Sequence, residues 1–452
     1  MHWKTIALAM LLAQSSFFSE VMEVRVTNVD VVVTGRDHKP VSGLKLEDFE
    51  LYEDGVKKEI TNFLEVREDA TPSLDTTTAT TSVAPAETKA PEDIRRRQIV
   101  IFVDNAAVQR AHRNAVLPFV DKFVKQNVRK GDEVALITWE HSLKAVLEPT
   151  TDFTAMDAAL KTLEQQTSAT AGANYRQFQD QILFTIRAYQ SSGRMPPWAE
   201  AVAQARHYAM EATQTTRQRV EALKIVAASM RGAPGRKILV FVTENLASNP
   251  AEAAFAYIDS IKDQFDGYDG PSMNQAHDFE IEGLVRDVAD IANSAGVTLY
   301  PIDVGGKYAG SDFSDASQAR VVTSVATVVT QTASLTVNGL ASETGGAALY
   351  GATNWQLAFD TISNDLNTYY SLGYRSSGEK QDRLRHIEVR LKNNKRYTVR
   401  TRTAVIEPSA ASEMNDAVAA HLFRDVGGND LAIRASAGDA KPADNEAVVI
   451  PL

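Results

Sequence analysis

Short apolar runs alternate with longer segments of helical periodicity through the middle of the chain. Residues 99–103, 237–242 and 297–304 are three such runs, built mainly from Val, Ile, Leu and aromatic residues. They are too short for a helix and too continuous for a strand with one wet face, which is typical of strands buried on both faces. Residues 111–128 and 198–230 carry apolar side chains at helical spacing. The pattern predicts an α/β fold with a Rossmann-like, doubly wound and mostly parallel sheet.

The segments on either side of this block alternate between apolar and polar residues. The alternation runs through residues 24–33 and 49–66 before the block, and through residues 370–374 and 387–401 after it. A period of two is that of a strand with one buried face. Each group has too few strands to bury a face alone. We therefore expect one small antiparallel β-sandwich, with the α/β domain inserted in it or flanked by it.

These patterns divide the chain into six segments. They are a signal peptide (1–20), an N-terminal sandwich part (21–66), a disordered linker (67–95), the α/β domain (96–367), a C-terminal sandwich part (368–406) and a tail that could begin a further β unit (407–452). The linker is rich in Thr, Ala, Pro and Ser, so it cannot bury enough apolar surface to offset the entropy cost of ordering. The pattern does not decide between helix and strand for residues 321–337.

The N-terminus has the layout of a secretory signal. His2 and Lys4 precede the apolar residues 6–13, and small and polar residues follow at 14–16. Even when it is extended to Phe18, this run is shorter than the roughly 20 residues that a membrane span requires. No later stretch of the sequence qualifies. We expect a secreted or periplasmic protein without a membrane span.

Composition excludes several classes of function. The 452 residues carry a formal net charge of −11, with a pI near 5.3, which does not favour nucleic-acid binding because that requires a basic face. The chain has no Cys, so disulfides, thiolate metal sites and a cysteine nucleophile are excluded. The 8 His show no metal-binding spacing, and there is no Gly-x-Ser-x-Gly motif. The partner expected on these grounds is a protein or an extracellular polymer; the sequence does not determine the oligomeric state.

Acidic and amide residues follow the apolar runs where the predicted strands end. Because the carboxyl ends of parallel strands meet at one edge of a sheet, and open α/β sheets bind their ligands there, these residues should share one face. The candidate ligand-binding residues of this strand-end face are Asp104, Asn105, Asn174, Glu244, Asn245 and Asp303. Helix capping and polar lining of the sheet edge are the alternative roles for Asp104 and Glu244.

Several short motifs occur in an order and at spacings that resemble a known family. They are Asn28-Val29-Asp30-Val31-Val32-Val33-Thr34, residues 44–55, Gly235-Arg236-Lys237, Tyr300-Pro301-Ile302-Asp303, Glu343-Thr344-Gly345-Gly346 and Tyr369-Tyr370-Ser371-Leu372-Gly373-Tyr374. The chain resembles the acidobacterial von Willebrand factor A-related family over about residues 21–403. The resemblance implies that the α/β domain is of the von Willebrand factor A type.

The resemblance also implies where a metal ion would bind, and the sequence departs from that pattern. In metal-binding relatives the first strand ends in Asp-x-Ser-x-Ser, whereas here Asp104 is followed by Ala106 and Val108 at the serine positions. Ala173 stands where a threonine ligand would be, and Glu244 where an aspartate would be. Hard cations require several oxygen ligands. We therefore predict a degenerate site without metal or cofactor, with Mg or Ca held by Asp104 and Glu244 as the alternative.

The function that these observations favour is that of an exported, non-enzymatic binding or scaffold protein. Its von Willebrand factor A-type domain would recognise a protein or polymer through the strand-end face. Two alternatives remain. One is a cation-dependent adhesion module, and the other is a hydrolase that uses the strand-end carboxylates Asp104, Glu244 and Asp303.

Overall fold

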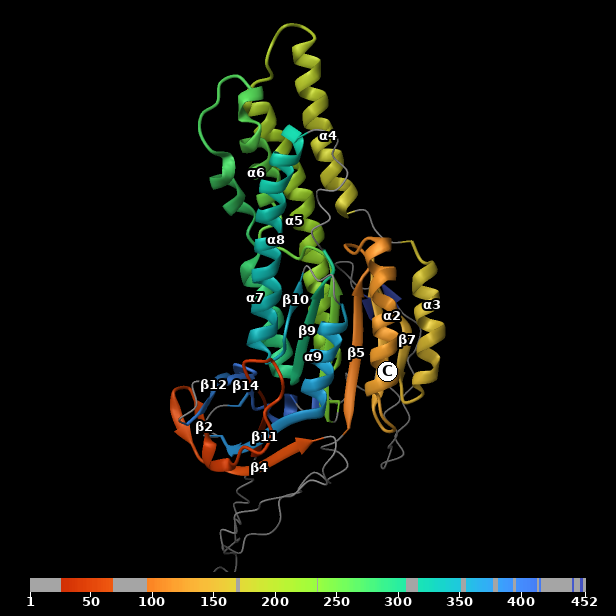
Figure 1. Ribbon diagram of the computed structural model, residues 1–452, viewed down its shortest axis with the longest axis vertical. Coiled ribbons are helices and arrows are strands. Elements are labelled where there is room, and N and C mark those ends of the chain that lie inside the picture. Colours follow the sequence, from red (N-terminus) through yellow and green to blue (C-terminus); the bar gives the residue numbers. More distant parts are fainter. Residues whose placement is uncertain are drawn as a thin grey trace, which may run out of the picture.

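A six-stranded, mostly parallel sheet forms the centre of the molecule (Figure 1). The computed structural model describes residues 26–67, 96–167, 171–233, 235–305, 316–350, 355–376, 381–392, 396–412, 414–415, 441–442 and 448–449. The strand order is β10-β9-β8-β5-β6-β7, in which only the edge strand β7 is antiparallel to its neighbour. The strands are β5 (Arg97–Asp104), β6 (Glu133–Trp139), β7 (Leu143–Thr150), β8 (Arg236–Thr243), β9 (Val297–Asp303) and β10 (Leu349–Tyr350).

Helices cover both faces of this sheet. One face carries α2 (Arg110–Asn127), α3 (Met156–Gln165) and α9 (Trp355–Asn367), and the other carries α5 (Trp198–Ser229), α7 (Glu282–Ala295) and α8 (Ala316–Glu343). Every residue of β5 is buried, with Ile99 and Ile101 in the first core and Val100 and Phe102 in the second. Alternation of side chains between two covered faces explains the continuous apolar run. The predicted mixed α/β architecture with a mostly parallel sheet is confirmed.

A group of helices rises beyond the carboxyl ends of the strands (Figure 1). This helical projection consists of α4 (Ala171–Gln190), the N-terminal half of α5, α6 (Glu252–Ser260) and the 3₁₀ segments η3 (Lys262–Gln264) and η4 (Ser272–Phe279). It has its own apolar core, which includes Phe178, Trp198 and Phe255. Helix α5 has 32 residues and is therefore about 48 Å long, so its two halves lie in different cores. The sequence pattern predicted α5 but not this separate core.

Two four-stranded antiparallel sheets pack together near the amino ends of the parallel strands (Figure 1). Their strands, in spatial order, are β13 (Thr398–Thr401), β1 (Val26–Thr34), β11 (Thr368–Arg375) and β4 (Ile60–Arg67) in one sheet, and β14 (Ala404–Ile406), β12 (Leu384–Leu391), β2 (Phe49–Glu53) and β3 (Val56–Lys58) in the other. Each sheet thus combines strands from before and after the α/β domain. The core between them includes Val29, Val31, Leu51 and Leu372.

A buried cluster of charged and aromatic side chains joins this sandwich to the α/β domain. The carboxylate of Asp365, a residue 1% exposed on α9, accepts hydrogen bonds from Arg400 of β13 at 2.6 and 2.7 Å. The same carboxylate accepts a hydrogen bond from the Tyr300 hydroxyl at 3.1 Å. The full set, which we call the junction cluster, is Asp30, Arg236, Tyr300, Asp365, Tyr369 and Arg400.

Arg236 is the second cation of the junction cluster and begins β8. It donates to the backbone carbonyl of Asp365 at 2.7 Å and lies 4.1 Å from the ring centroid of Tyr369. Its Nε is 3.4 Å from Asp30 of β1. Arg236 therefore contacts the helix before the second sandwich part and both central strands of one sandwich sheet.

The structure determines the secondary structure of residues 321–337, which the sequence pattern left open. It does not test the predictions for the N-terminus, the linker and the tail. Residues 321–337 lie in the helix α8, where Val337 and Leu340 pack on the sheet and outweigh the strand preference of a Thr- and Val-rich sequence. The predicted signal peptide at 1–20 and nearly all of the linker fall outside the described residues, as does most of the tail, apart from short pieces that include β15 (Lys441–Pro442) and β16 (Val448–Val449). No helix among the described residues is both long and apolar enough to cross a bilayer. The segment boundaries remain predictions.

Replacing Arg400 by Met should reduce the free energy of unfolding by about 3 kcal/mol, because it leaves the buried Asp365 carboxylate without its cation. The matched control is Arg390→Met, which removes a pair with Glu388 whose two side chains are 57% and 51% exposed. The control substitution should lower the free energy of unfolding by less than about 1 kcal/mol. Urea titration of both variants measures the difference, and equal losses would contradict a structural role for the junction cluster.

Candidate functional site

The guanidinium of Arg219 lies in a cage of oxygen atoms at the carboxyl end of β5. Its Nε donates to Asp104 Oδ2 at 2.7 Å, and its Nη2 donates to the Thr243 hydroxyl at 3.0 Å and to the Glu244 carbonyl at 2.9 Å. Thr243 in turn donates its hydroxyl hydrogen to Asp104 Oδ2 at 2.9 Å. Asp104 is 1% exposed and Thr243 0%. This guanidinium cage neutralises the Asp104 carboxylate inside the protein.

The Glu244 side chain turns to the opposite face of the sheet and holds the start of α2. It accepts hydrogen bonds from the backbone N–H of Gln109 at 2.8 Å and from the Gln109 amide at 3.1 Å. Nδ1 of His112 is 3.1 Å from Glu244 Oε2. This hydrogen bond to Glu244 raises the pKa of His112. Glu244 therefore acts at a helix N-terminus, where a carboxylate is favoured.

Asp303 ends β9 and binds backbone N–H groups. It accepts from Asn245 at 3.0 and 3.2 Å and from Gly305 at 2.8 Å. Asn245, at a φ of 51°, is in the left-handed region that asparagine tolerates. Burial raises the pKa of Asp303 to about 6, and the nearby Glu244 carboxylate adds to the rise although the backbone donors oppose it. This carboxyl therefore changes its protonation state near pH 6.

For Asn105 and Asn174, the remaining candidates, no hydrogen bond to these carboxylates is found among the described residues. Asn105 is buried; its amide donates to the Thr167 carbonyl at 2.9 Å, and its Oδ1 accepts from Arg113 at 2.5 Å. Arg113 is itself 0% exposed and also donates to the Gln166 carbonyl. Asn105 thus connects the end of β5 by a hydrogen bond to the segment after α3. Asn174 is exposed near the start of α4, so it lies on a helix.

The structure places Asp104, Thr243 and Asp303 in one row across three neighbouring strands. Thr243 is in register with Asp303, and Val242, which precedes it, is in register with Val103, which precedes Asp104. Because adjacent strands are spaced about 4.8 Å apart, the backbones at Asp104 and Asp303 are separated by roughly 10 Å, with β8 between them. The two aspartates do not form a carboxyl pair.

The residues at the strand ends do not fit the metal ion that the resemblance implies. Among the described residues, no group of three His, Asp or Glu side chains could hold a metal ion. The Oδ1 atom of Asp104 is buried without a hydrogen-bond partner in the described part of the chain. One free carboxylate oxygen does not supply the six or so ligands that a hard cation takes, and the Arg219 guanidinium already lies among the other oxygens.

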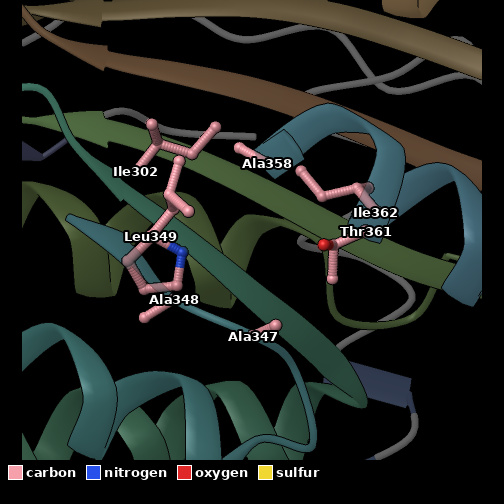
Figure 2. Close-up of a pocket in the computed structure, with 8 residues that line it drawn as sticks. Ile302, Ala347, Ala348, Leu349, Ala358, Thr361 and Ile362 are labelled. Carbon is pink, nitrogen blue, oxygen red and sulfur yellow. The ribbon is translucent and has the colours of Figure 1, made fainter. Parts of the chain in front are cut away.

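A small apolar crevice lies elsewhere, between β9, β10 and α9. Figure 2 shows Ile302 and Leu349 from the strands facing Ala358 and Ile362 of the helix. Its volume of about 20 Å³ is room for about one water molecule. The crevice is too small and too apolar to bind a substrate.

Arg219 is the principal residue of the site that sequence reasoning missed. Its signal is a charged residue on the buried stripe of a long helix, where Thr213 and Thr216 precede it and Val220 and Leu223 follow it. A buried arginine requires an anion. The stripe could have been recognised from the sequence, but the identity of the anion could not, because Asp104 is 115 residues away.

Sequence comparisons assign no family to this chain. No family model matches the sequence. No curated protein matches it significantly.

Comparison with solved structures gives weak likenesses only. An aerotolerance-related membrane protein from Bacteroides fragilis is 12% identical, with 60% of this chain and 98% of that chain covered and a TM-score of 0.24. The conserved hypothetical protein BatB from Bacteroides thetaiotaomicron is 8% identical, covering 60% and 96%, with a TM-score of 0.27. The manganese-loaded TRAP protein of Plasmodium vivax is 8% identical, covering 70% and 96%, with a TM-score of 0.26. Scores this low do not establish a shared fold.

Replacing Arg219 by Met should lower the free energy of unfolding by about 3–5 kcal/mol, because the Asp104 carboxylate is then buried without a counter-ion. The matched control is Arg217→Met, an exposed arginine on the same helix, which should change it by less than about 0.5 kcal/mol. The double variant Arg219→Met with Asp104→Asn should recover part of the loss. A single variant as stable as the control would contradict the guanidinium cage.

The stability of the protein should depend on pH through Asp303. A carboxyl with a higher pKa in the folded than in the unfolded chain contributes stability that is complete below about pH 4 and is lost as pH rises through about 6. Between about pH 5 and about pH 7.5 the wild type should therefore lose roughly 1 kcal/mol more than Asp303→Asn. The His112–Glu244 pair acts in the same direction but is present in both proteins.

Urea titrations at the two pH values measure this difference. The exposed Asp269→Asn is the control and should follow the wild type. An Asp303→Asn variant with the pH dependence of the wild type would show that Asp303 is not the titrating group.

Proposed function

We propose that this chain is an exported, non-enzymatic binding or scaffold protein built on a von Willebrand factor A-type domain. In this proposal it recognises a protein or an extracellular polymer through the strand-end face, without a metal ion or a cofactor. The observation that carries the proposal is the guanidinium cage, in which Arg219 supplies from within the chain the positive charge that a bound cation would otherwise supply. The family resemblance of the sequence supports the type of domain, and the signal-like N-terminus supports export.

A ligand can reach fewer of the candidate residues on this face than the sequence suggested. Asp104, Asn105, Glu244 and Asp303 are each 5% exposed or less. Around them, Asn245 is exposed and Gln109 and His112 are half-buried; we call these three residues the recognition rim. The rim is uncharged except when His112 is protonated. We therefore expect a ligand that accepts and donates hydrogen bonds rather than one that binds through a carboxylate on a metal.

The buried carboxylates also argue against the hydrolase alternative. A general acid or base must come within hydrogen-bonding distance of the substrate. Asp104 is occupied by Arg219 and Thr243, and Asp303 by two backbone N–H groups. Glu244 is held by Gln109 and His112 at the start of α2. In these positions the three carboxylates serve to order the strand ends.

Ligand capture from the native envelope fraction, with and without excess EDTA, tests the proposal. We expect the same retained ligand in both, because the recognition rim needs no cation. Asn245→Gly, which keeps the left-handed backbone but removes the side chain, and His112→Ala should each weaken binding at least about tenfold. Lys57→Ala, on the exposed surface of the sandwich, is the control and should bind normally.

Two outcomes would contradict the proposal. Capture that EDTA abolishes, together with calorimetric binding of Mg, Mn or Ca that Asp104→Ala removes, would support the cation-dependent adhesion alternative. Turnover of a retained polymer that is lost in Asp303→Asn would support the hydrolase alternative.

A further inference from the structure

Gly296 joins α7 to β9 at the amino end of the parallel sheet. It has a φ of 71° and ends the helix, and β9 begins at the next residue. In Figure 1 this end of α7 faces the sandwich, which it contacts through β14. The turn therefore lies at the opposite end of the strands from the recognition rim.

Two cationic side chains meet over this glycine. Nη1 of Arg402 would lie 3.4 Å, and Nζ of Lys237 3.6 Å, from a Cβ at position 296. Since both nitrogens lie within 3.6 Å of one point, they are at most about 7 Å apart. A third cation, Arg231, donates to the hydroxyl of Ser294, two residues before the glycine. We call Arg231, Lys237 and Arg402, which are all half-buried, the basic turn cluster.

Arg402 lacks the carboxylate partner that a neighbouring arginine has. Arg400, two residues earlier, pairs with the buried Asp365 at 2.6 Å. Within the described ranges Arg402 has no such ion pair, and its side chain makes one hydrogen bond, from Nη2 to the Gly296 carbonyl at 3.5 Å. Burial lowers the pKa of Arg402, although the nearby Asp30 opposes this change. The positive charge of Arg402 is therefore only partly compensated within the described residues.

The C-terminus of α7 explains why cations gather at this turn, but it does not balance their charge. Lys237 donates to the Ala295 carbonyl at 2.9 Å, and Arg402 to the carbonyl of the next residue. A helix C-terminus is equivalent to roughly half a negative charge. The two side chains together carry two positive charges. The potential at the turn thus favours an anion.

We propose that the basic turn cluster binds an oxyanion of the phosphate or sulfate type between Arg402 and Lys237, over Gly296. Charge-assisted hydrogen bonds to such a group are about 2.7–2.9 Å long, so one oxyanion can bridge two donors at this separation. A phosphate group carries about −1.5 to −2 charges at neutral pH and has three acceptor oxygens, which suits two cations better than a carboxylate does. A side chain at position 296 would fill the space between the two donors.

The anion site is independent of the proposed function, because the two lie at opposite ends of the parallel strands. A loss of anion binding should therefore leave ligand capture at the recognition rim unchanged.

Calorimetric titration of the full-length protein with sodium phosphate and with sodium sulfate, at constant ionic strength, tests the proposal. We expect the wild type to bind both ions. Arg402→Gln and Lys237→Gln should each weaken binding at least about tenfold, because each removes a charge-assisted contact. Arg402→Lys keeps the charge and should retain part of the affinity. The matched control is Arg390→Gln, an exposed arginine on the sandwich that pairs with Glu388, and it should bind as the wild type does.

Thermal melting separates binding from folding. Phosphate should raise the Tm of the wild type and of Arg390→Gln, because a ligand that binds only the folded chain stabilises it. The increase should be much smaller for Arg402→Gln and Lys237→Gln. If Arg402→Gln does not fold, Arg402→Lys and Lys237→Gln still supply the comparison.

A sulfated dextran distinguishes a free ion from a group that is carried on a polymer. Tighter binding per sulfate group than that of inorganic sulfate, with the same dependence on Arg402 and Lys237, would identify a polymer-linked group, and equal affinity would identify the free ion. A wild type that binds neither ion, an unchanged affinity in both Gln variants at the turn, or an equal loss in Arg390→Gln would each overturn the proposal.

Discussion

The buried carboxylate of Asp365 is the constraint on which the arrangement of the whole molecule depends. It lies where α9 passes into β11 and pairs with Arg400 of the sandwich, while Arg236 of the parallel sheet donates to the backbone carbonyl of the same residue. The buried carboxylate would be left uncompensated if it lost Arg400. The sandwich is therefore fixed against the amino ends of the strands. The carboxyl ends, with the helical projection, remain as the face on which the recognition proposed above can occur.

Several residues of the motifs that carry the family resemblance lie at this junction, and of these motifs Tyr300-Pro301-Ile302-Asp303 also reaches the strand-end face, at Asp303. Tyr300 and Tyr369 belong to the junction cluster. In Glu343-Thr344-Gly345-Gly346, a Cβ on Gly345 would lie 2.6 Å from the carbonyl carbon of Thr401, and Gly345 has a φ of 79°. Only glycine lets α8 end this close to the sandwich. The motif residues Tyr300, Gly345 and Tyr369 therefore report how the two parts are joined rather than what the strand ends bind.

This difference explains how far the sequence could predict the structure. Strand ends could be predicted because apolar runs stop at them, and Asp104 and Asp303 do end β5 and β9. The partners of these residues could not be predicted, since Arg219 and Asn245 reach them from other elements. The separate core of the helical projection could not be predicted from the sequence either. The buried stripe of α5 runs without a break through Thr213, Thr216 and Arg219, where the first core gives way to the second, so its periodicity alone does not show that the helix packs in two cores.

Arg219 lies on α5 between the part of the helix that packs in the core of the helical projection and the part that packs on the sheet. C-terminal to it, Val220 and Leu223 pack on the sheet, whereas the start of the helix packs in the core of the projection. Moving α5 away from the end of β5 would leave the Asp104 carboxylate buried without its counter-ion. Under the proposed function, a ligand that contacts both the recognition rim and the projection would meet two surfaces that one helix, α5, connects. Little of its binding free energy would then be lost to ordering the protein.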